Sequence, residues 1–233
     1  MGRALLDRLH GDPSANDVIE RDDGYVEPED TARYLAHRRA WSPIEREAFQ
    51  ALRGRVLDVG CGGGRVALAL QERGQEVVAI DVSPGVLQVC RERGVRDVEL
   101  RSVTQISRIG PFDSVALFGN NLGLLADRRR AVWILRRLRG VLTPGGCVVA
   151  SNRDPYATDD PLHLAYHSRN RARGRMSGQV RLRVRYKHQA TPWFDYLFLS
   201  LDEVRSITAD AGWAVREVIA GPGPEYAVVL ESR

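Results

Sequence analysis

The chain has 233 residues, of which 43% are hydrophobic and 27% charged, and its formal net charge is +4. This balance is typical of a globular protein with one large or two small domains, and it argues against a disordered chain. The sequence has no apolar run long enough for a membrane-spanning helix or a signal peptide. Its three cysteines form no C-x-x-C pair, so we expect no disulfide framework, no zinc site built from cysteines and a cytoplasmic location.

The N-terminal segment, residues 1–53, is predicted to form a polar helical cap. Residues 31–40 and 43–52 both carry apolar side chains at a spacing that favours helices, and the second helix is expected to end at Gly54. The pattern then changes to short apolar runs.

From residue 54 onward, predicted strands and helices alternate. The expected strands are 56–59, 77–80, 98–100, 112–118 and 147–150, and the expected helices are 66–70, 84–93 and 127–139. Such alternation indicates βαβ units and a parallel sheet. Continuous apolar strands such as 77–80 favour a sheet that helices cover on both faces.

Residues 154–199 interrupt this pattern as an insertion that we expect to act as a substrate lid. Within it, Val180, Leu182, Val184 and Tyr186 alternate with basic side chains, which predicts an antiparallel strand with one exposed face. A helix at 201–211 and a hairpin of strands 214–219 and 226–230 follow. The whole chain is therefore predicted to be a single α/β domain with its core at 54–153, the lid after the fifth strand and a terminal segment at 200–233.

Basic side chains are concentrated in this insertion, where eight occur between Pro161 and Phe194 without any acid. The remainder of the chain is slightly acidic, so the composition does not imply a general affinity for nucleic acid. Two interpretations stay open for the alternating arginines. They form either a solvated outer face or a surface that recognises an acidic substrate or partner.

A glycine-rich segment, Gly60–Gly64, follows the first core strand, and Asp58 lies just before it. Glycine permits a tight turn and close approach of a ligand, and the next helix directs N–H groups at an anion. The dinucleotide pattern G-x-G-x-x-G fits poorly, because Arg65 occupies its last glycine position and Asp58 would repel a pyrophosphate. An acid beside glycine N–H groups instead suits a zwitterion; the alternative is a tight turn without a ligand.

A second acid, Asp81, ends the next core strand. Its carboxylate can accept hydrogen bonds from two adjacent ribose hydroxyls, at about 1.5–3 kcal/mol each. A ribose diol joined to an amino-acid zwitterion describes S-adenosylmethionine (SAM). The alternative is that Asp81 only caps the following helix beside Ser83.

These motifs resemble those of the class I (Rossmann-like) SAM-dependent methyltransferases. Val56–Leu70 is similar to their motif I and Asp81 matches their second acidic motif. The segments 112–117 and 138–146 resemble their fourth-strand motif and the turn into strand five. The resemblance covers about residues 54–152, and it implies a three-layer fold with a seven-stranded sheet whose last strand is antiparallel.

The resemblance also implies a set of SAM contacts. These are Asp58, Gly60, Cys61, Gly62, Gly64, Asp81, Val82, Val103, Thr104 and Asn120. Cys61 itself is expected to be a small buried residue rather than a reactive thiol. Many members carry an acid after strand three that reaches adenine, whereas this chain does not. Adenine is therefore expected at backbone groups near Val103 and Thr104 or at the side chain of Gln105.

Acceptor contacts are expected from loops after strands four and five and from the insertion. Asn121 could orient an acceptor or simply form a turn. His163 and His167 share one helix face; they could act as a base or substrate ligands, bind a metal with Asp159 or Asp160, or carry no chemistry. Further candidates are Asn152, Tyr156, Trp193 and Tyr196, with core packing as the alternative for the aromatic pair.

The sequence therefore favours a SAM-dependent methyltransferase that acts on nitrogen or oxygen, less readily on carbon, of a small molecule. Proximity and alignment would supply much of the catalysis, because the sulfonium methyl donor is already activated. An RNA or protein acceptor is an alternative, but Gly119-Asn120-Asn121-Leu122 stands where an Asn-Pro-Pro-aromatic motif would be expected. A non-catalytic SAM-binding protein is the third possibility. We expect neither membrane nor nucleic-acid partners, and no oligomeric state is predicted.

Overall fold

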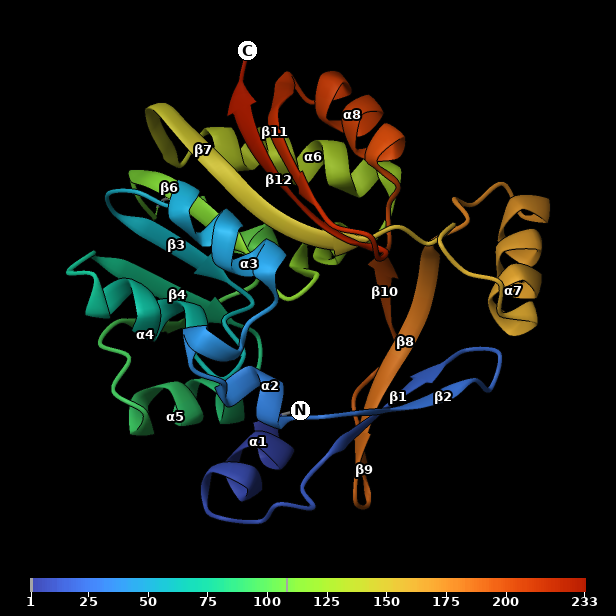
Figure 1. The fold of residues 1–233 in the computed structure, drawn as a ribbon, viewed down its shortest axis with the longest axis horizontal. Helices are drawn as coiled ribbons and strands as arrows, with labels where there is room; N and C mark the ends of the chain where they lie inside the picture. The colour runs from blue at the N-terminus through green and yellow to red at the C-terminus, as the bar shows by residue number, and fades with distance from the viewer. Residues whose placement is uncertain (1, 108) are drawn as a thin grey trace.

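The computed structural model describes residues 2–107 and 109–233. Its main sheet has seven strands in the order β11-β12-β7-β6-β3-β4-β5 (Figure 1). The strands are β3 (Val56–Val59), β4 (Val77–Asp81), β5 (Val98–Leu100), β6 (Phe112–Leu117), β7 (Leu142–Arg153), β11 (Trp213–Ala220) and β12 (Glu225–Ser232). β3 to β7 are parallel, whereas β12 pairs antiparallel with both β7 and β11, as predicted.

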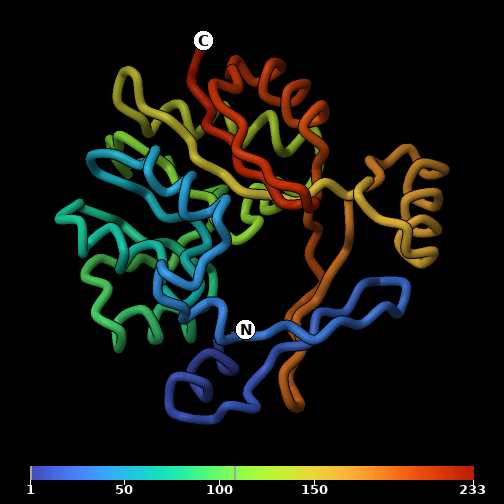
Figure 2. The backbone as a smooth tube through the Cα atoms, in the orientation of Figure 1, coloured from blue at the N-terminus to red at the C-terminus, as the bar shows by residue number. Residues whose placement is uncertain are grey.

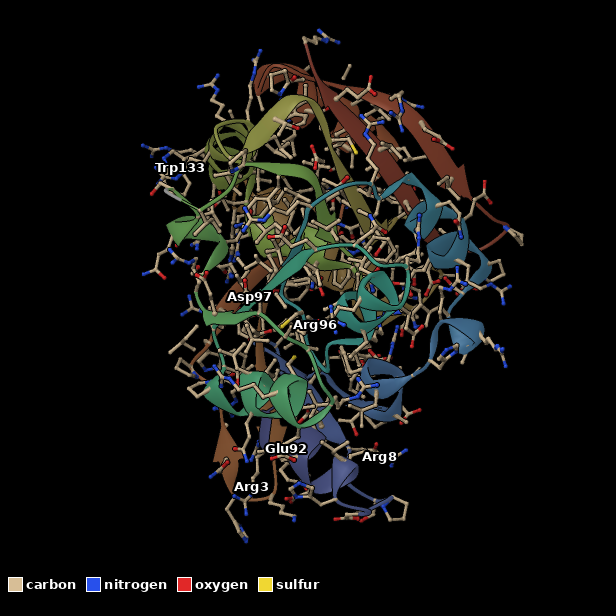
Figure 3. All side chains as sticks on the ribbon, turned by 90° about the vertical axis from the view of Figure 1, so that its left-hand side faces the viewer. Arg3, Arg8, Glu92, Arg96, Asp97 and Trp133 are labelled. Atoms are coloured by element: carbon tan, nitrogen blue, oxygen red, sulfur yellow. The ribbon has the colours of Figure 1, made fainter. Side chains whose placement is uncertain are left out.

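Helices cover both faces of this sheet, because its central strands are apolar on both sides. In β3, Val56 packs on the side of α4 and α5, and Leu57 and Val59 pack on the side of α6 and α8. The covering helices are α3 (Pro43–Ala48), α4 (Arg65–Glu72), α5 (Pro84–Glu92), α6 (Arg128–Arg139) and α8 (Leu201–Asp210). Figure 3 shows one edge of this arrangement, with Trp133 on α6 and Glu92 at the end of α5 labelled. The three-layer expectation is confirmed.

A second sheet stands beside the first, with the strand order β10-β8-β1-β2 and β9 paired to β8. Its strands, which we call the roof sheet, are β1 (Asp17–Arg21), β2 (Val26–Glu29), β8 (Gln179–Tyr186), β9 (Gln189–Ala190) and β10 (Phe194–Leu197). All pairings are antiparallel, so the antiparallel strand expected in the insertion is confirmed. Figure 2 shows the N-terminal hairpin lying beside strands from the insertion.

The prediction of a wholly helical N-terminal cap is wrong for residues 17–29, which form β1 and β2. The segment does contain α1 (Gly2–Leu9), α2 (Ala32–Leu35) and two short 3₁₀ helices, η1 (Arg38–Ala40) and η2 (Phe49–Ala51), besides α3. β1 pairs with β8, a strand far along the chain, and such long-range pairing can override local sequence preference.

Three further elements complete the chain. They are α7 (Pro161–Ala172) in the insertion, η3 (Val103–Gln105) after β5 and η4 (Asn121–Leu125) after β6. Among the helices of the described residues, none combines the length and apolar character needed to cross a bilayer.

Contacts at both of its ends attach the roof sheet to the main domain. At one end, Asp7 of α1 accepts hydrogen bonds from Tyr186 Oη (2.8 Å) and Lys187 Nζ (2.7 Å), and α1 packs closely on α5. An added Cβ on Gly85 of α5 would lie 3.2 Å from Gly2. At the other end, Tyr196 of β10 donates a hydrogen bond to the carbonyl of Asn120 at 2.5 Å. The roof is therefore held over the sheet on both sides.

Candidate active site

A cleft of about 1180 Å³ lies between the carboxyl ends of the parallel strands and the roof sheet. Cross-strand pairs of the roof place Ile19 opposite Val184 and Arg21 opposite Leu182, and all four side chains line the cleft. Aromatic side chains contribute much of the remaining wall: Tyr25, Tyr34, Phe118, Trp193, Phe194, Tyr196 and Phe198. The cleft is therefore a largely apolar chamber with polar groups at defined points.

Asp58 lies at the floor of the cleft, at the end of β3, and is 2% exposed. Among the described residues, no hydrogen-bond donor pairs with its Oδ2. Burial raises the pKa of Asp58 to about 7, while the positive charge of Arg65 opposes this rise. A buried carboxylate oxygen without a partner is costly, and an ammonium group would satisfy it.

The glycine turn beside Asp58 has the geometry that only glycine adopts readily. Gly60 and Gly62 have positive φ angles of 70° and 52°, and both line the cleft. An added Cβ on Gly60 would lie 2.6 Å from the Asn121 amide nitrogen. That nitrogen donates to the carbonyls of Val59 (3.0 Å) and Gly60 (2.8 Å). Asn121 therefore holds the turn from the side, and its amide N–H groups are engaged there.

Gly64 and Cys61 belong to the same turn, and both pack against the protein interior. Gly64 does not line the cleft; an added Cβ there would lie 2.8 Å from Val95. Cys61 lines the cleft but is buried, with its sulfur 3.6 Å from that of Cys90. The hydrogen bond to Cys90 and burial both raise the pKa of Cys61, so the small-residue interpretation agrees with the geometry.

Asp81, at the end of β4, faces the cleft beside this turn. Its Oδ1 accepts the N–H of Ser83 at 2.9 Å and its Oδ2 accepts that of Gly62 at 3.4 Å. Burial raises its pKa, and these backbone hydrogen bonds oppose the rise. A carboxylate has about four lone-pair positions, so Asp81 retains capacity for two further donors. Val82, next to it, is 69% exposed and lines the cleft.

The segment expected near adenine divides into two parts. Val103 lines the cleft, whereas Thr104 does not, and its hydroxyl bonds to Ser102 Oγ at 3.0 Å. Gln105 Oε1 accepts the N–H of Ser102 at 3.2 Å as part of a capping box. Gln105 does not line the cleft and its Oε1 caps η3, so the geometry favours backbone groups near Val103 over this side chain for adenine.

An ion pair between Arg65 and Glu45 lies beside the cleft, and no sequence motif predicts it. Arg65 makes two hydrogen bonds to the Glu45 carboxylate, at 2.8 and 2.7 Å, and Glu45 also accepts the N–H of Gly119 at 2.9 Å. Arg65 stacks over Trp41 with 4.6 Å to the ring centroid. The pair fixes the first residue of α4 against the end of β6, and because Glu45 and Gly119 are distant in sequence, no local pattern reveals it.

The predicted acceptor-side residues fall into two groups. Trp193 and Tyr196 line the cleft, as does Asn120, which is expected to contact SAM. Asn152 and Tyr156 do not: Asn152 is fully buried and donates to the Leu197 carbonyl at 3.1 Å, and Tyr156 donates to Glu203 at 3.0 Å. These two side chains hold the segments around β10 and α8 instead of facing the cleft.

His163 and His167 lie on α7, share one helix face as their spacing predicts, and both line the cleft. Nδ1 of His163 is hydrogen-bonded to Arg21 at 2.9 Å. Burial, followed by the charges of His163, Arg171 and Arg21, lowers the pKa of His167. Within residues 2–107 and 109–233, no group of three or more His, Cys, Asp or Glu side chains has an arrangement for a metal ion.

The alternating basic side chains of β8 point away from the cleft. Arg183 and Arg185 bind Glu20 at 2.9 Å, and Lys187 binds Asp7. Their neighbours Leu182 and Val184 occupy the inner face. The solvated-face interpretation is therefore the one that the geometry supports, and these arginines do not face an acceptor within the cleft.

Comparisons with known proteins agree with this site. A family model described as a methyltransferase domain matches residues 56–146. A ubiquinone biosynthesis O-methyltransferase of Xanthomonas axonopodis pv. citri is 36% identical over 112 residues, which cover 44% of this chain and 45% of that protein. The matched stretch thus spans about half the length of this curated relative.

Solved structures extend the similarity. A SAM-dependent methyltransferase from Bacteroides fragilis, in complex with S-adenosyl-L-homocysteine, is 26% identical with a TM-score of 0.85, covering 99% of this chain and 93% of that one. The 1,6-didemethyltoxoflavin-N1-methyltransferase of Burkholderia thailandensis shares the fold at 19% identity and a TM-score of 0.54, over 82% and 78% of the two chains. With the glycine turn between two acids at the ends of neighbouring strands, these similarities lead to one conclusion: residues 56–146 form a methyltransferase domain, in a chain that has the fold of the SAM-dependent methyltransferases.

Proposed function

We propose that this protein is an enzyme that binds SAM at the inner end of the cleft and methylates a small molecule held beneath the roof sheet. The observation that carries the proposal is the buried Asp58 carboxylate, whose Oδ2 has no partner among the described residues beside a glycine turn. The cleft, at about 1180 Å³, also exceeds the roughly 300–1,000 Å³ of a typical single-ligand site. It therefore has room for a second molecule next to the cofactor.

The residues at the inner end fit the parts of SAM. Asp58 would bind the ammonium group, and the N–H groups of the Gly60–Gly64 turn would bind the carboxylate. Asp81 would accept the ribose hydroxyls, with Val82 and Val103 beside the nucleoside. When bound, the cofactor supplies a methyl group on a positively charged sulfur. The task of the chain is to hold the acceptor in line with that group.

The acceptor atom is proposed to be oxygen or nitrogen, with oxygen favoured because the curated relatives are named O-methyltransferases. Of the three candidate catalytic residues, Asn121 uses its amide N–H groups on the glycine turn. Acid–base and hydrogen-bonding roles toward the acceptor therefore fall to His163 and His167, which line the cleft. A neutral His167 suits proton acceptance from a hydroxyl.

A small acceptor is favoured over RNA or a protein by the roof sheet, which covers the cleft and is anchored on both sides. The basic side chains that could attract a polyanion lie on the outer face, and several are paired with acids. The same proposal places the protein in a reducing cytoplasm, and its support is that all three cysteines are free and buried.

Isothermal titration calorimetry with SAM and S-adenosylhomocysteine tests the cofactor assignment. Asp81→Ala removes two charge-assisted hydrogen bonds and should weaken SAM binding by about ten- to a hundredfold. Asp97→Ala, a matched loss of an exposed carboxylate labelled in Figure 3, should leave the affinity unchanged. Absence of binding to folded wild-type protein would end the proposal, and equal affinities for the two variants would refute the role of Asp81.

A further inference from the structure

Arg21, at the end of β1, is a buried arginine of the roof sheet that has polar and aromatic partners on several sides. It is 6% exposed, and its Nε and Nη2 bind the two oxygens of Asp23 at 2.8 and 2.9 Å. Its guanidinium lies over the rings of Tyr25 and Tyr166, with 4.7 and 4.2 Å to their centroids. A buried cation held on so many sides keeps one position, and the remaining nitrogen, Nη1, is directed at a single partner.

That partner is Nδ1 of His163, at 2.9 Å. A guanidinium can only donate hydrogen bonds, so Nδ1 of His163 must accept, which requires a ring without a proton at that nitrogen. The neutral ring then carries its proton on Nε2. Which nitrogen bears the proton is thus fixed by the hydrogen bond that the other nitrogen makes.

The Nε2–H group of His163 has no protein acceptor at hydrogen-bonding distance among the described residues. The nearest carboxylate oxygen, Asp160 Oδ2, is 3.8 Å away, which is too long for a hydrogen bond. The other oxygen of Asp160 caps α7 through the N–H of Leu162 at 2.8 Å. The ring of His163 lines the cleft and meets Tyr25, another lining residue, edge to face at 5.0 Å.

His167 lies one helical turn further along the same face of α7. Its neighbours include Arg21 on β1, His163 and Arg171 on its own helix, and the ring of Tyr156 at 6.1 Å. Burial disfavours a positive charge on its ring, and the charges of Arg171 and Arg21 act in the same direction. The helix therefore presents two histidines to the cleft, and among the described residues only His163 has a hydrogen-bond partner that dictates its tautomer.

We propose that Arg21 fixes His163 as a neutral Nε2–H donor that binds an oxygen atom of a planar, hydroxylated acceptor molecule. The inference rests on the proposed methyl transfer and names the substrate class for it. A planar ring fits the walls, where Trp193, Tyr196 and Phe198 provide flat apolar surfaces. An oxygen supplies the acceptor atom that Nε2–H requires. Arg21 is a positioning residue in this scheme, because it acts through His163.

The first test reads the tautomer directly, without any turnover. Two-dimensional ¹H–¹⁵N spectra of the histidine rings, recorded at about pH 8 where an ordinary histidine is neutral, distinguish protonated from unprotonated ring nitrogens. The chain has five histidines, so a His163→Asn spectrum assigns the signal. We expect a proton on Nε2 in the wild type, mixed tautomers in Arg21→Met, and recovery in Arg21→Lys, which retains a cationic donor. A proton on Nδ1 in the wild type would overturn the inference.

The second test uses catechol as the probe, added to the protein saturated with S-adenosylhomocysteine. Catechol should shift the Nε2 resonance of His163, whereas toluene, which lacks oxygen, should not. His163→Asn, whose amide replaces only the Nδ1 side, should weaken catechol binding by about tenfold, the value of one lost hydrogen bond. His163→Gln, whose amide reaches the Nε2 position, should recover part of this loss. No catechol-dependent shift, or equal affinities in wild type and His163→Asn, would overturn the proposal.

A matched control distinguishes a change in the tautomer or in catechol affinity from a general effect of lost charge or of misfolding. Arg181→Met removes a positive charge from the outer face of the roof and should leave both the tautomer and catechol affinity unchanged. Binding of S-adenosylhomocysteine to each variant reports an intact inner site. Failure of the wild type to bind that nucleoside refutes the proposed function, whereas the tautomer measurement can fail independently of it.

Discussion

At the scale of single residues, Asp58 combines burial with a carboxyl group that titrates near neutral pH. Its side chain is 2% exposed, and its pKa is raised to about 7 by the loss of hydration. An ammonium ligand binds the ionised form, so binding must draw the carboxyl group toward its deprotonated state. If Asp58 binds the ammonium group as proposed, protonation of Asp58 and binding of SAM compete.

This competition predicts a pH dependence of SAM affinity. As pH falls below the pKa of about 7, a proton must leave Asp58 on binding, and affinity should fall by up to about tenfold per pH unit. Above that pKa the affinity should level off. Calorimetry between about pH 5.5 and 7.5, in buffers of different ionisation enthalpy, measures both the affinity and the released proton.

Asp58→Asn supplies the control for this measurement. The amide cannot ionise, so the variant should bind SAM weakly, and the part of the pH dependence due to Asp58 should disappear. An affinity that is constant across this range in the wild type, or an equal slope in the variant, would contradict the assignment of Asp58 to the ammonium group.

Residue-scale inference from sequence succeeded where the chemistry is local. Asp58, Gly60 and Asp81 lie at strand ends and line the cleft, as expected from a turn that follows a buried strand. The Glu45–Arg65 pair and the Arg21–His163 contact could not be predicted, because each depends on how distant segments fold together. The role of Asn121 could not be predicted either, because its hydrogen-bond partners are the carbonyls of Val59 and Gly60, which are distant in sequence.

At the scale of elements, the contact between β10 and η4 anchors one end of the roof. Tyr196 donates to the carbonyl of Asn120 at 2.5 Å, and an added Cβ on Gly123 would lie 2.1 Å from the Tyr196 ring. Burial raises the pKa of Tyr196, so its hydroxyl remains protonated and able to donate at neutral pH. The close approach requires a residue without a side chain at position 123.

Gly123→Ala should therefore force β10 and η4 apart and lower the free energy of unfolding by about 1–3 kcal/mol. Gly140→Ala is the matched control, because its added Cβ would meet only the Arg137 carbonyl at 3.4 Å and its φ is −73°. Urea unfolding followed by circular dichroism measures both variants. Equal stabilities would show that the roof does not depend on this contact.

The elements differ in how far the sequence determined them. β3 was predicted to the residue, because the short run of β-forming residues at 56–59 follows Gly54-Arg55 and ends at Gly60. β7 extends further than predicted, over Leu142–Arg153, because Leu142 pairs with β6 at one end and residues 151–153 pair with β12 at the other. β1 was missed, because one of its two partner strands, β8, comes so much later in the chain.

At the scale of the whole molecule, the roof sheet is expected to be formed in the protein without ligands. β8 lies between β1 and β10, and attachments at Asp7 and Tyr196 hold it from both sides. Backbone amides of 179–186 should therefore exchange with deuterium much more slowly than those of the exposed turn 221–224. Hydrogen exchange with mass spectrometry measures this; equally fast exchange that slows only when SAM is added would contradict a preformed roof.

The roof sheet takes its strands from two regions, one before the nucleoside-binding core and one after it. Ile19 and Arg21 come from the first region and Leu182 and Val184 from the second, yet they form one continuous surface over the cleft. Transplanting substrate preference between such enzymes would consequently require both regions to be exchanged together. A chimera that receives only the segment with β8 would pair it with the β1–β2 hairpin of the other enzyme. Only part of the surface that lines the cleft would then be exchanged.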